Sequence, residues 1–192
     1  MTTVPVAEQM TAEEFMARPE TNSALRESLV DGEVVVNQPL PSHAQVQVNL
    51  VYALESWIRA GSARGRVATP LDVLLDDRNV YNPDLLWYAE GRAPTDRSPA
   101  PYPLPSIAAE IRSPSTWRYD LGIKKSSYER QGLAELWLLD TAADTALVYR
   151  RSRHRAPSFD VALELSGTKQ LTSPLLSGFA VAVDEIFTVP GA

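Results

Sequence analysis

The stretch that most constrains the fold of this chain spans residues 107–128, where a short apolar run leads into an amphipathic helix. The run IAAEI carries one carboxylate, Glu110, among residues typical of a buried strand. After a Ser-Pro-Ser turn, Asp120, Lys124 and Tyr128 follow at spacings of four residues, so a helix places them on one face. Because an unpaired charge is costly in an apolar strand, Glu110 needs a partner. The segment therefore predicts a buried acid that faces a lysine on the next helix.

Two helices are predicted before this segment. Apolar residues occur at helical period over residues 42–60, and Gly61 is a suitable stop. Ser42 and Gln45 have the spacing of a capping box at the start of this helix. A second capping box predicts a short helix over residues 12–17.

The early strands are predicted to form two antiparallel pairs. Asp31-Gly32 between two β-rich runs indicates a hairpin over residues 25–38. Residues 67–75 and 80–88 have the pattern of a second pair. Pro83 cannot donate to a strand ladder, so it predicts a bulge or a strand start that could aim a side chain into a site.

Together these patterns predict an α+β fold, loosely α/β-like, with helices flanking a mixed central β-sheet and a hairpin near the N-terminus. The nearly continuous apolar run at residues 135–140 is typical of a central strand, and a helix over residues 118–131 precedes it. More peripheral strands are expected at residues 147–151, 158–165 and 178–183. Since no internal repeat or linker is visible, residues 1–192 are interpreted as a single domain with a loose arm at residues 1–10.

The composition of the chain excludes several classes of function. The formal net charge of -6 argues against loose, purely electrostatic binding to nucleic acid, although a local basic patch can exist on an acidic body. The absence of cysteine excludes disulfides, zinc–thiolate sites and a cysteine nucleophile. No apolar run is long enough to span a membrane, and the N-terminus lacks the pattern of a signal peptide, so a cytoplasmic protein without membrane contact is expected.

Asp84 is the candidate partner of Glu110 at a metal site, because the two acids lie on strands that could be neighbours. Mg²⁺ and Mn²⁺ take carboxylate and backbone oxygens, so these acids and the carbonyl of Ile111 would suffice. A bound ion would activate water and neutralise phosphate charge, and Lys124 could stabilise the developing charge. Spacing alone favours a simpler interpretation, a turn residue and a surface ion pair. The apolar surroundings of Glu110 shift the prediction toward the metal site.

Several short motifs occur in a fixed order over about residues 11–187. They are Leu29-Val30-Asp31-Gly32-Glu33, Pro41-Ser42-His43, Pro83-Asp84, Ala109-Glu110-Ile111-Arg112-Ser113-Pro114-Ser115, Asp120, Lys124, Tyr128, Gly132, Glu135-Leu136-Trp137 and Asp140. In this order the chain resembles the Uma-type restriction endonuclease family of the PD-(D/E)XK nuclease-like superfamily. The resemblance implies a restriction-endonuclease-like core with Asp84 and Glu110 as metal ligands. It also implies that Lys124 is the catalytic lysine, moved from the strand onto the following helix.

Two positions depart from the pattern of this family. Arg112 stands where the superfamily usually has its lysine; it faces the same way as Glu110 on a strand and could clamp a phosphate, but it cannot act as a base. Family members usually carry a glutamate directly before the hairpin turn motif, where this chain has Ser28. The nearby acid is Glu27, which a regular strand sends to the opposite face. A third acidic ligand would therefore require a bulge.

Each of the weaker candidates for site residues also has a purely structural interpretation. His43 lies at a helix start, where a positive charge is unfavourable, so a neutral imidazole could touch a phosphate or simply bond locally. Asp120 is expected to orient Lys124, with a plain surface pair as the alternative. The basic run at residues 150–155 could follow a DNA backbone, but a solvated hairpin loop is the favoured interpretation. Tyr128 fits the core better than a base-stacking role.

Two functions fit these sequence patterns. The leading hypothesis is a Mg²⁺- or Mn²⁺-dependent endonuclease that cleaves DNA with metal-activated water, acting through Asp84, Glu110 and Lys124. A homodimer is expected, because nucleases that cut duplex DNA often pair two sites. The alternative is a catalytically weak or inactive nuclease-fold protein that binds DNA or serves as a scaffold. The net charge, Arg112 and the displaced Glu27 favour this alternative.

Overall fold

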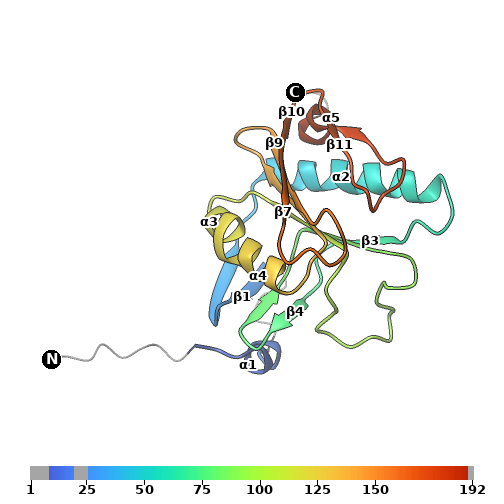
Figure 1. Cartoon of the computed structure of the whole chain (residues 1–192). Coiled ribbons are helices and arrows are strands. Elements are labelled where there is room, and N and C mark those ends of the chain that lie inside the picture. The colour runs from blue at the N-terminus through green and yellow to red at the C-terminus, as the bar shows by residue number, and fades with distance from the viewer. Residues whose placement is uncertain (1–8, 20–25, 190–192) are drawn as a thin grey trace.

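The structure, a computed structural model, describes residues 9–19 and 26–189, which form sheets flanked by helices (Figure 1). The helical elements are α1 (Ala12–Met16), α2 (Pro41–Arg59), α3 (Trp117–Tyr119), the π-helical turn η1 (Asp120–Lys124), α4 (Lys125–Arg130) and α5 (Val183–Phe187). The first six strands are β1 (Arg26–Val30), β2 (Glu33–Asn37), β3 (Arg66–Ala68), β4 (Val73–Asp76), β5 (Asn79–Tyr81) and β6 (Leu85–Tyr88). The later strands are β7 (Ile107–Ile111), β8 (Glu135–Asp140), β9 (Thr145–Arg150), β10 (Val161–Ser166), β11 (Gln170–Leu171) and β12 (Val181–Ala182).

The central sheet has six strands in the order β10-β9-β8-β7-β6-β3. Strands β7 and β8 pair in parallel, and the other neighbours pair antiparallel. A parallel pair needs a crossover connection, and the helical segment from α3 to α4 provides it. The run predicted to be central forms β8, which lies between β7 and β9 as expected.

The two faces of the central sheet pack against different elements. Strand β7 sends Ile107, Ala109 and Ile111 into a core shared with α2 and α5, which lie beside each other in Figure 1. Its alternate residues, Ala108 and Glu110, face the other side, where α4 and the four-stranded sheet pack. The strict alternation of a strand is therefore what directs Glu110 away from the apolar core beneath α2.

The hairpin sheet has the strand order β2-β1-β5-β4. The predicted hairpin is confirmed: Asp31 (φ 51°) and Gly32 (φ 79°) both adopt the left-handed conformation that a two-residue turn of this kind requires. The second predicted pair is confirmed as an antiparallel pairing of the two runs, β3 with β6 and β4 with β5, but each run is broken midway. Strands β3 and β6 join the central sheet, whereas β4 and β5 join the hairpin sheet. Pro70 and Pro83 lie in the two breaks, where they cannot donate to a ladder.

The start of α1 agrees with the prediction from local sequence, whereas the start of α2 differs from it. The capping box of Thr11 and Glu14 forms at α1 as predicted. The box predicted for α2 is wrong, because this helix begins one residue earlier, at Pro41, with Leu40 as N-cap and no side-chain cap. Proline favours the first helical position, since its missing N–H would be unpaired there anyway.

The predicted loose arm lies mostly outside the described residues, but its end is held. The amide of Met10 donates to the carbonyl of Gly32 at 3.0 Å, so this part of the arm packs on the hairpin turn. Near the other end, the strand predicted at residues 178–183 is shortened to β12, which pairs with β11 in a separate small sheet. Over the described residues, no helix combines the length and the apolar character needed to cross a lipid bilayer.

Candidate active site

Asp84 and Glu110 meet where β6 begins and β7 ends. Leu85 pairs with Ala109 in the antiparallel register, so the next pair along the ladder sets Asp84 opposite Glu110. Both side chains are buried, at 1% and 3% exposure. Asp84 Oδ2 also accepts a hydrogen bond of 2.7 Å from the amide of Ile111. The break at Pro83 thus ends with a carboxylate fixed against the last residue of β7.

The helical segment after β7 supplies two polar groups to Glu110. Lys124 Nζ lies 3.2 Å from Glu110 Oε1, and the hydroxyl of Tyr128 donates to the same oxygen at 2.9 Å. Lys124 is 4% exposed and Tyr128 fully buried. The shared helix face predicted for these residues is therefore found, and it points at the acid of the preceding strand.

Asp120 completes the cluster from a π-helical turn. Its Oδ1 lies 2.8 Å from Lys124 Nζ, and its Oδ2 accepts a hydrogen bond of 3.2 Å from Thr116 Oγ1. The sequence predicted a plain helix here, but the segment from Asp120 to Lys124 is π-helical. Such turns are rare and frequently occur at functional sites. Here the turn contains both members of the Asp120–Lys124 ion pair.

The cluster combines three buried acids with one buried lysine. Burial raises the pKa of Glu110 to about 8, with the charges of Asp120 and Asp84 adding to the effect and Lys124 opposing it. Burial likewise raises the pKa of Asp120. Burial alone would lower the pKa of Lys124, but the charges of Glu110 and Asp120 outweigh it and raise that pKa above its usual value. Lys124 is therefore the persistent cation of the cluster, whereas the raised pKa of Glu110 lets this acid hold a proton near neutral pH.

Three residues hold Asp84 from the opposite side. His43 Nε2 lies 3.1 Å from Asp84 Oδ2, without the angle of a good hydrogen bond. Arg26 Nη1 lies 3.3 Å from Asp84 Oδ1, and Gln47 Nε2 donates to the Asp84 carbonyl at 2.6 Å. Sequence reasoning missed Arg26 and Gln47, although each had a signal. Gln47 lies four residues after His43 on one helix face, and Arg26 shares its strand face with Ser28.

Two of the predicted supporting residues make other contacts. Strands β1 and β2 pair in an unbroken register, so no bulge brings Glu27 inward, and its carboxylate instead pairs with Arg18 at 2.8 Å. Arg112 pairs with Asp140 at 2.8 Å and lies over the ring of Trp117 at 5.7 Å. The strand ends at Ile111, so the alternation that would have aligned Arg112 with Glu110 no longer applies.

The basic run after β9 is partly structural. Arg151 donates to the carbonyl of Leu133 at 3.0 Å and also to the carbonyls of Glu129 and Ala156. Its guanidinium thereby ties the end of α4 to the loop after β9. The neighbouring Arg153 and His154 are exposed, which fits the favoured interpretation of a solvated hairpin loop.

The donor set fits a hard divalent cation that keeps part of its water shell. Over the described residues, no three His, Asp or Glu side chains are arranged as a ready-made metal cage. Mg²⁺ does not require one, because it is commonly held by one or two carboxylates together with waters and substrate phosphates. Asp84 and Glu110 supply such oxygens, and Asp120 Oδ1 is buried without a well-oriented hydrogen bond. A divalent cation would favour the ionised form of Glu110, so these acids are suitable ligands for one.

A known protein structure shares this architecture. The structure is similar to a crystal structure described as that of "a putative nuclease belonging to DUF820" from Anabaena variabilis, with a TM-score of 0.76 and 19% sequence identity. The match covers 93% of this chain and 97% of the other. The predicted α+β, restriction-endonuclease-like fold is thus confirmed.

The family of the chain is also defined. The model of the Uma2 family, described as "Putative restriction endonuclease", matches residues 12–184, and the chain belongs to this family. The resemblance drawn from the short motifs is therefore confirmed. None of the curated proteins matches the chain.

Proposed function

We propose that this chain is a single nuclease-like domain that acts as a divalent-metal-dependent endonuclease and hydrolyses DNA phosphodiester bonds with metal-activated water. The observation that carries the proposal is the buried cluster of Asp84, Glu110 and Asp120 around Lys124. Membership of a family described as "Putative restriction endonuclease" supports DNA as the substrate.

Each residue of the cluster has a distinct proposed role. Asp84, Glu110 and the carbonyl of Ile111 would hold Mg²⁺ or Mn²⁺. When bound, such an ion supplies a water of lowered pKa and neutralises charge on the phosphate. Lys124 remains protonated, so it stabilises the negative charge that develops on the phosphate and does not act as a base. Asp120 positions Lys124 through the 2.8 Å ion pair.

A second candidate function is a catalytically weak or inactive nuclease-fold protein that binds DNA or serves as a scaffold. The observation in its favour is Arg26, whose guanidinium nitrogen lies 3.3 Å from Asp84 Oδ1, where it competes with a metal ion for the carboxylate. The outward position of Glu27 removes a third acid from the site. The homodimer and the cytoplasmic location remain predictions.

Cleavage of supercoiled plasmid DNA in the presence of Mg²⁺ or Mn²⁺ tests the proposal, with a metal chelator as blank. We expect Glu110→Gln to abolish metal-dependent cleavage, because it removes a charged ligand at nearly constant volume. Glu164→Gln, the same change on the exposed strand β10, is the matched control and should cleave like the wild type. Equal cleavage rates for Glu110→Gln and the wild type would contradict the site.

Calorimetric titration with Mn²⁺ separates the two candidate functions. The endonuclease proposal requires that the wild type binds the ion and that Glu110→Gln binds it more weakly. Binding of DNA without any heat of Mn²⁺ binding would instead favour the inactive binding or scaffold protein.

A further inference from the structure

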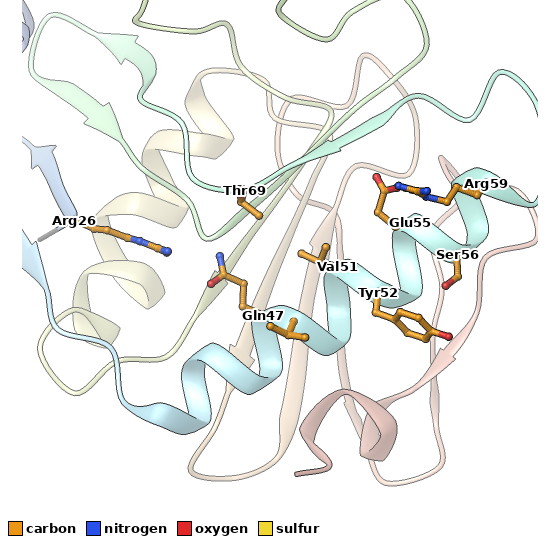
Figure 2. Close-up of a pocket in the computed structure, with 9 residues that line it drawn as sticks. Arg26, Gln47, Val51, Tyr52, Glu55, Ser56, Arg59 and Thr69 are labelled. Carbon is orange, nitrogen blue, oxygen red and sulfur yellow. The ribbon is translucent and has the colours of Figure 1, made fainter. Parts of the chain in front are cut away.

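A groove runs along the outer side of α2, between this helix and the segment that follows β3 (Figure 2). Its volume is about 680 Å³, which is ample for several planar rings. Most of the lining comes from α2, with Thr69 on the opposite wall and Arg26 of β1 at one end. This groove is separate from the buried carboxylate cluster, but it begins next to it.

The lining of the groove is mainly apolar and exposed. Val48 and Tyr52 are 61% and 74% exposed, and they lie four residues apart on one face of α2. Val51, one turn before Glu55, is half-buried beside them. Exposed apolar and aromatic side chains gathered in one groove, rather than scattered singly, mark a binding surface.

One end of the groove is continuous with the proposed active site. Arg26 and Gln47 line the groove, and the same two side chains contact Asp84, at 3.3 and 2.6 Å. Figure 2 shows Arg26 reaching from its strand toward Gln47 on α2. A chain-like ligand that occupies the groove would therefore reach the two side chains that contact the buried Asp84.

The other end carries a second cation. Arg59, near the end of α2, lines the groove and pairs with Glu55 at 2.9 Å, so its charge is partly offset. Gln47 and Arg59 are separated by 12 residues on α2, or about 18 Å of helix. This length corresponds to about five nucleotides at the stacked spacing of about 3.4 Å.

We propose that this groove binds an unpaired strand of nucleic acid, with bases against Tyr52 and Val48 and phosphates near Arg26 and Arg59. The inference rests on the proposed function, since the strand would belong to the substrate that is cut at Asp84. Aromatic side chains bind unpaired bases by stacking on their faces, and arginines bind the backbone. A duplex hides the faces of its bases and offers phosphates, which an apolar wall does not suit. A second copy of the chain lying there would cover the residues that hold Asp84.

Binding of short fluorescent oligonucleotides, measured by anisotropy in the presence of a chelator, tests the groove without cleavage. The arms are single-stranded DNA, single-stranded RNA of the same sequence, and duplex DNA. We expect a single strand to bind more tightly than the duplex. Comparison of the affinities for single-stranded DNA and RNA then shows which of the two sugars the groove prefers. Tyr52→Ala should weaken single-strand binding by roughly 5- to 150-fold, the range reported by alanine substitution of stacking residues, whereas Tyr52→Phe keeps the affinity.

Two further variants guard against a merely structural effect. Glu55→Gln frees Arg59, so it should tighten single-strand binding, and the gain should shrink as salt is raised. Leu163→Ala removes an exposed apolar side chain on β10, at the far edge of the central sheet, and should bind like the wild type.

The proposal is overturned if Tyr52→Ala binds single strands as tightly as the wild type, or if duplex DNA binds most tightly. It is also overturned if Tyr52→Ala turns a dimer into a monomer in sedimentation, which would assign the groove to a second copy. The binding test of the groove is independent of the cleavage test of the active site. Weakened binding by Tyr52→Ala together with unchanged cleavage by Glu110→Gln would leave the groove standing and reject the proposed catalytic residues.

Discussion

Replacing Lys124 by methionine removes the cation at the centre of the buried cluster while keeping an unbranched side chain. Lys124 Nζ lies 3.2 Å from Glu110 and 2.8 Å from Asp120, and all three side chains are at least 95% buried. The variant leaves these carboxylates without their shared partner. We therefore expect a loss of stability, a loss of cleavage and, in contrast, tighter binding of a divalent cation.

The magnitude follows from the burial of the cluster. Removing one partner of a buried ion pair costs about 3–5 kcal/mol, because the other charge stays buried and uncompensated. Two opposing effects reduce this loss. Protonation of Glu110 relieves part of it already at neutral pH, because burial raises the pKa of this acid to about 8, and protonation of Asp120 relieves more as the pH falls. A divalent ion at about 100 times its dissociation constant restores about 2.7 kcal/mol.

Urea unfolding at neutral pH, with and without Mn²⁺, measures both effects. Lys125→Met is the matched control, since its ammonium lies 4.6 Å above the ring of Tyr149 and it should cost only about 0.5–1 kcal/mol. We expect Mn²⁺ to stabilise Lys124→Met more than the wild type. A loss for Lys124→Met no larger than that for Lys125→Met, or no added stabilisation by Mn²⁺, would contradict the role of Lys124 as the shared partner of the two carboxylates.

Three further predictions concern single contacts. Tyr128→Phe removes a 2.9 Å hydrogen bond to Glu110, so Mn²⁺ affinity measured by calorimetry should change, with a stability cost of about 1–3 kcal/mol; unchanged affinity would contradict the contact. Gly65 and Gly91 both have φ of 72°, but a Cβ at Gly65 meets the carbonyl of Tyr88, whereas one at Gly91 meets open space. Thermal melting should therefore show a larger loss for Gly65→Ala than for Gly91→Ala, and equal losses would argue against the close approach. Burial raises the pKa of the Tyr88 hydroxyl from 10.0 to about 12, so its contribution to stability is present below pH 10.0 and is lost as the pH rises toward 12. Tyr88→Phe should flatten this alkaline decline in urea unfolding, and an unchanged slope would contradict the assignment.

Local patterns in the sequence are enough to predict several elements of the fold. The hairpin turn at Asp31-Gly32 was predicted because few residues favour the left-handed conformation, and the helical period located most of α2. The isolated carboxylate in an apolar strand singled out Glu110, and the four-residue spacing placed Lys124 on a face that reaches it. Each of these signals involves residues close in the chain, where backbone geometry alone decides which side chains share a face.

Tertiary packing decides how the strands are divided between the two sheets and which residues surround Asp84. The break at Pro83 sends β5 and β6 to different sheets, a choice set by distant packing rather than by the pattern of either strand. The regular register of β1 turns Glu27 outward. It brings Arg26, a type of residue that is usually exposed, against the buried Asp84. Such contacts join residues far apart in the chain. The apolar period of a strand (two) or a helix (3.6) shows which face of the element is buried, but it does not show which other element packs on that face. For this reason the acid and the lysine could be predicted from the sequence, whereas the arginine beside Asp84 and the groove along α2 could not.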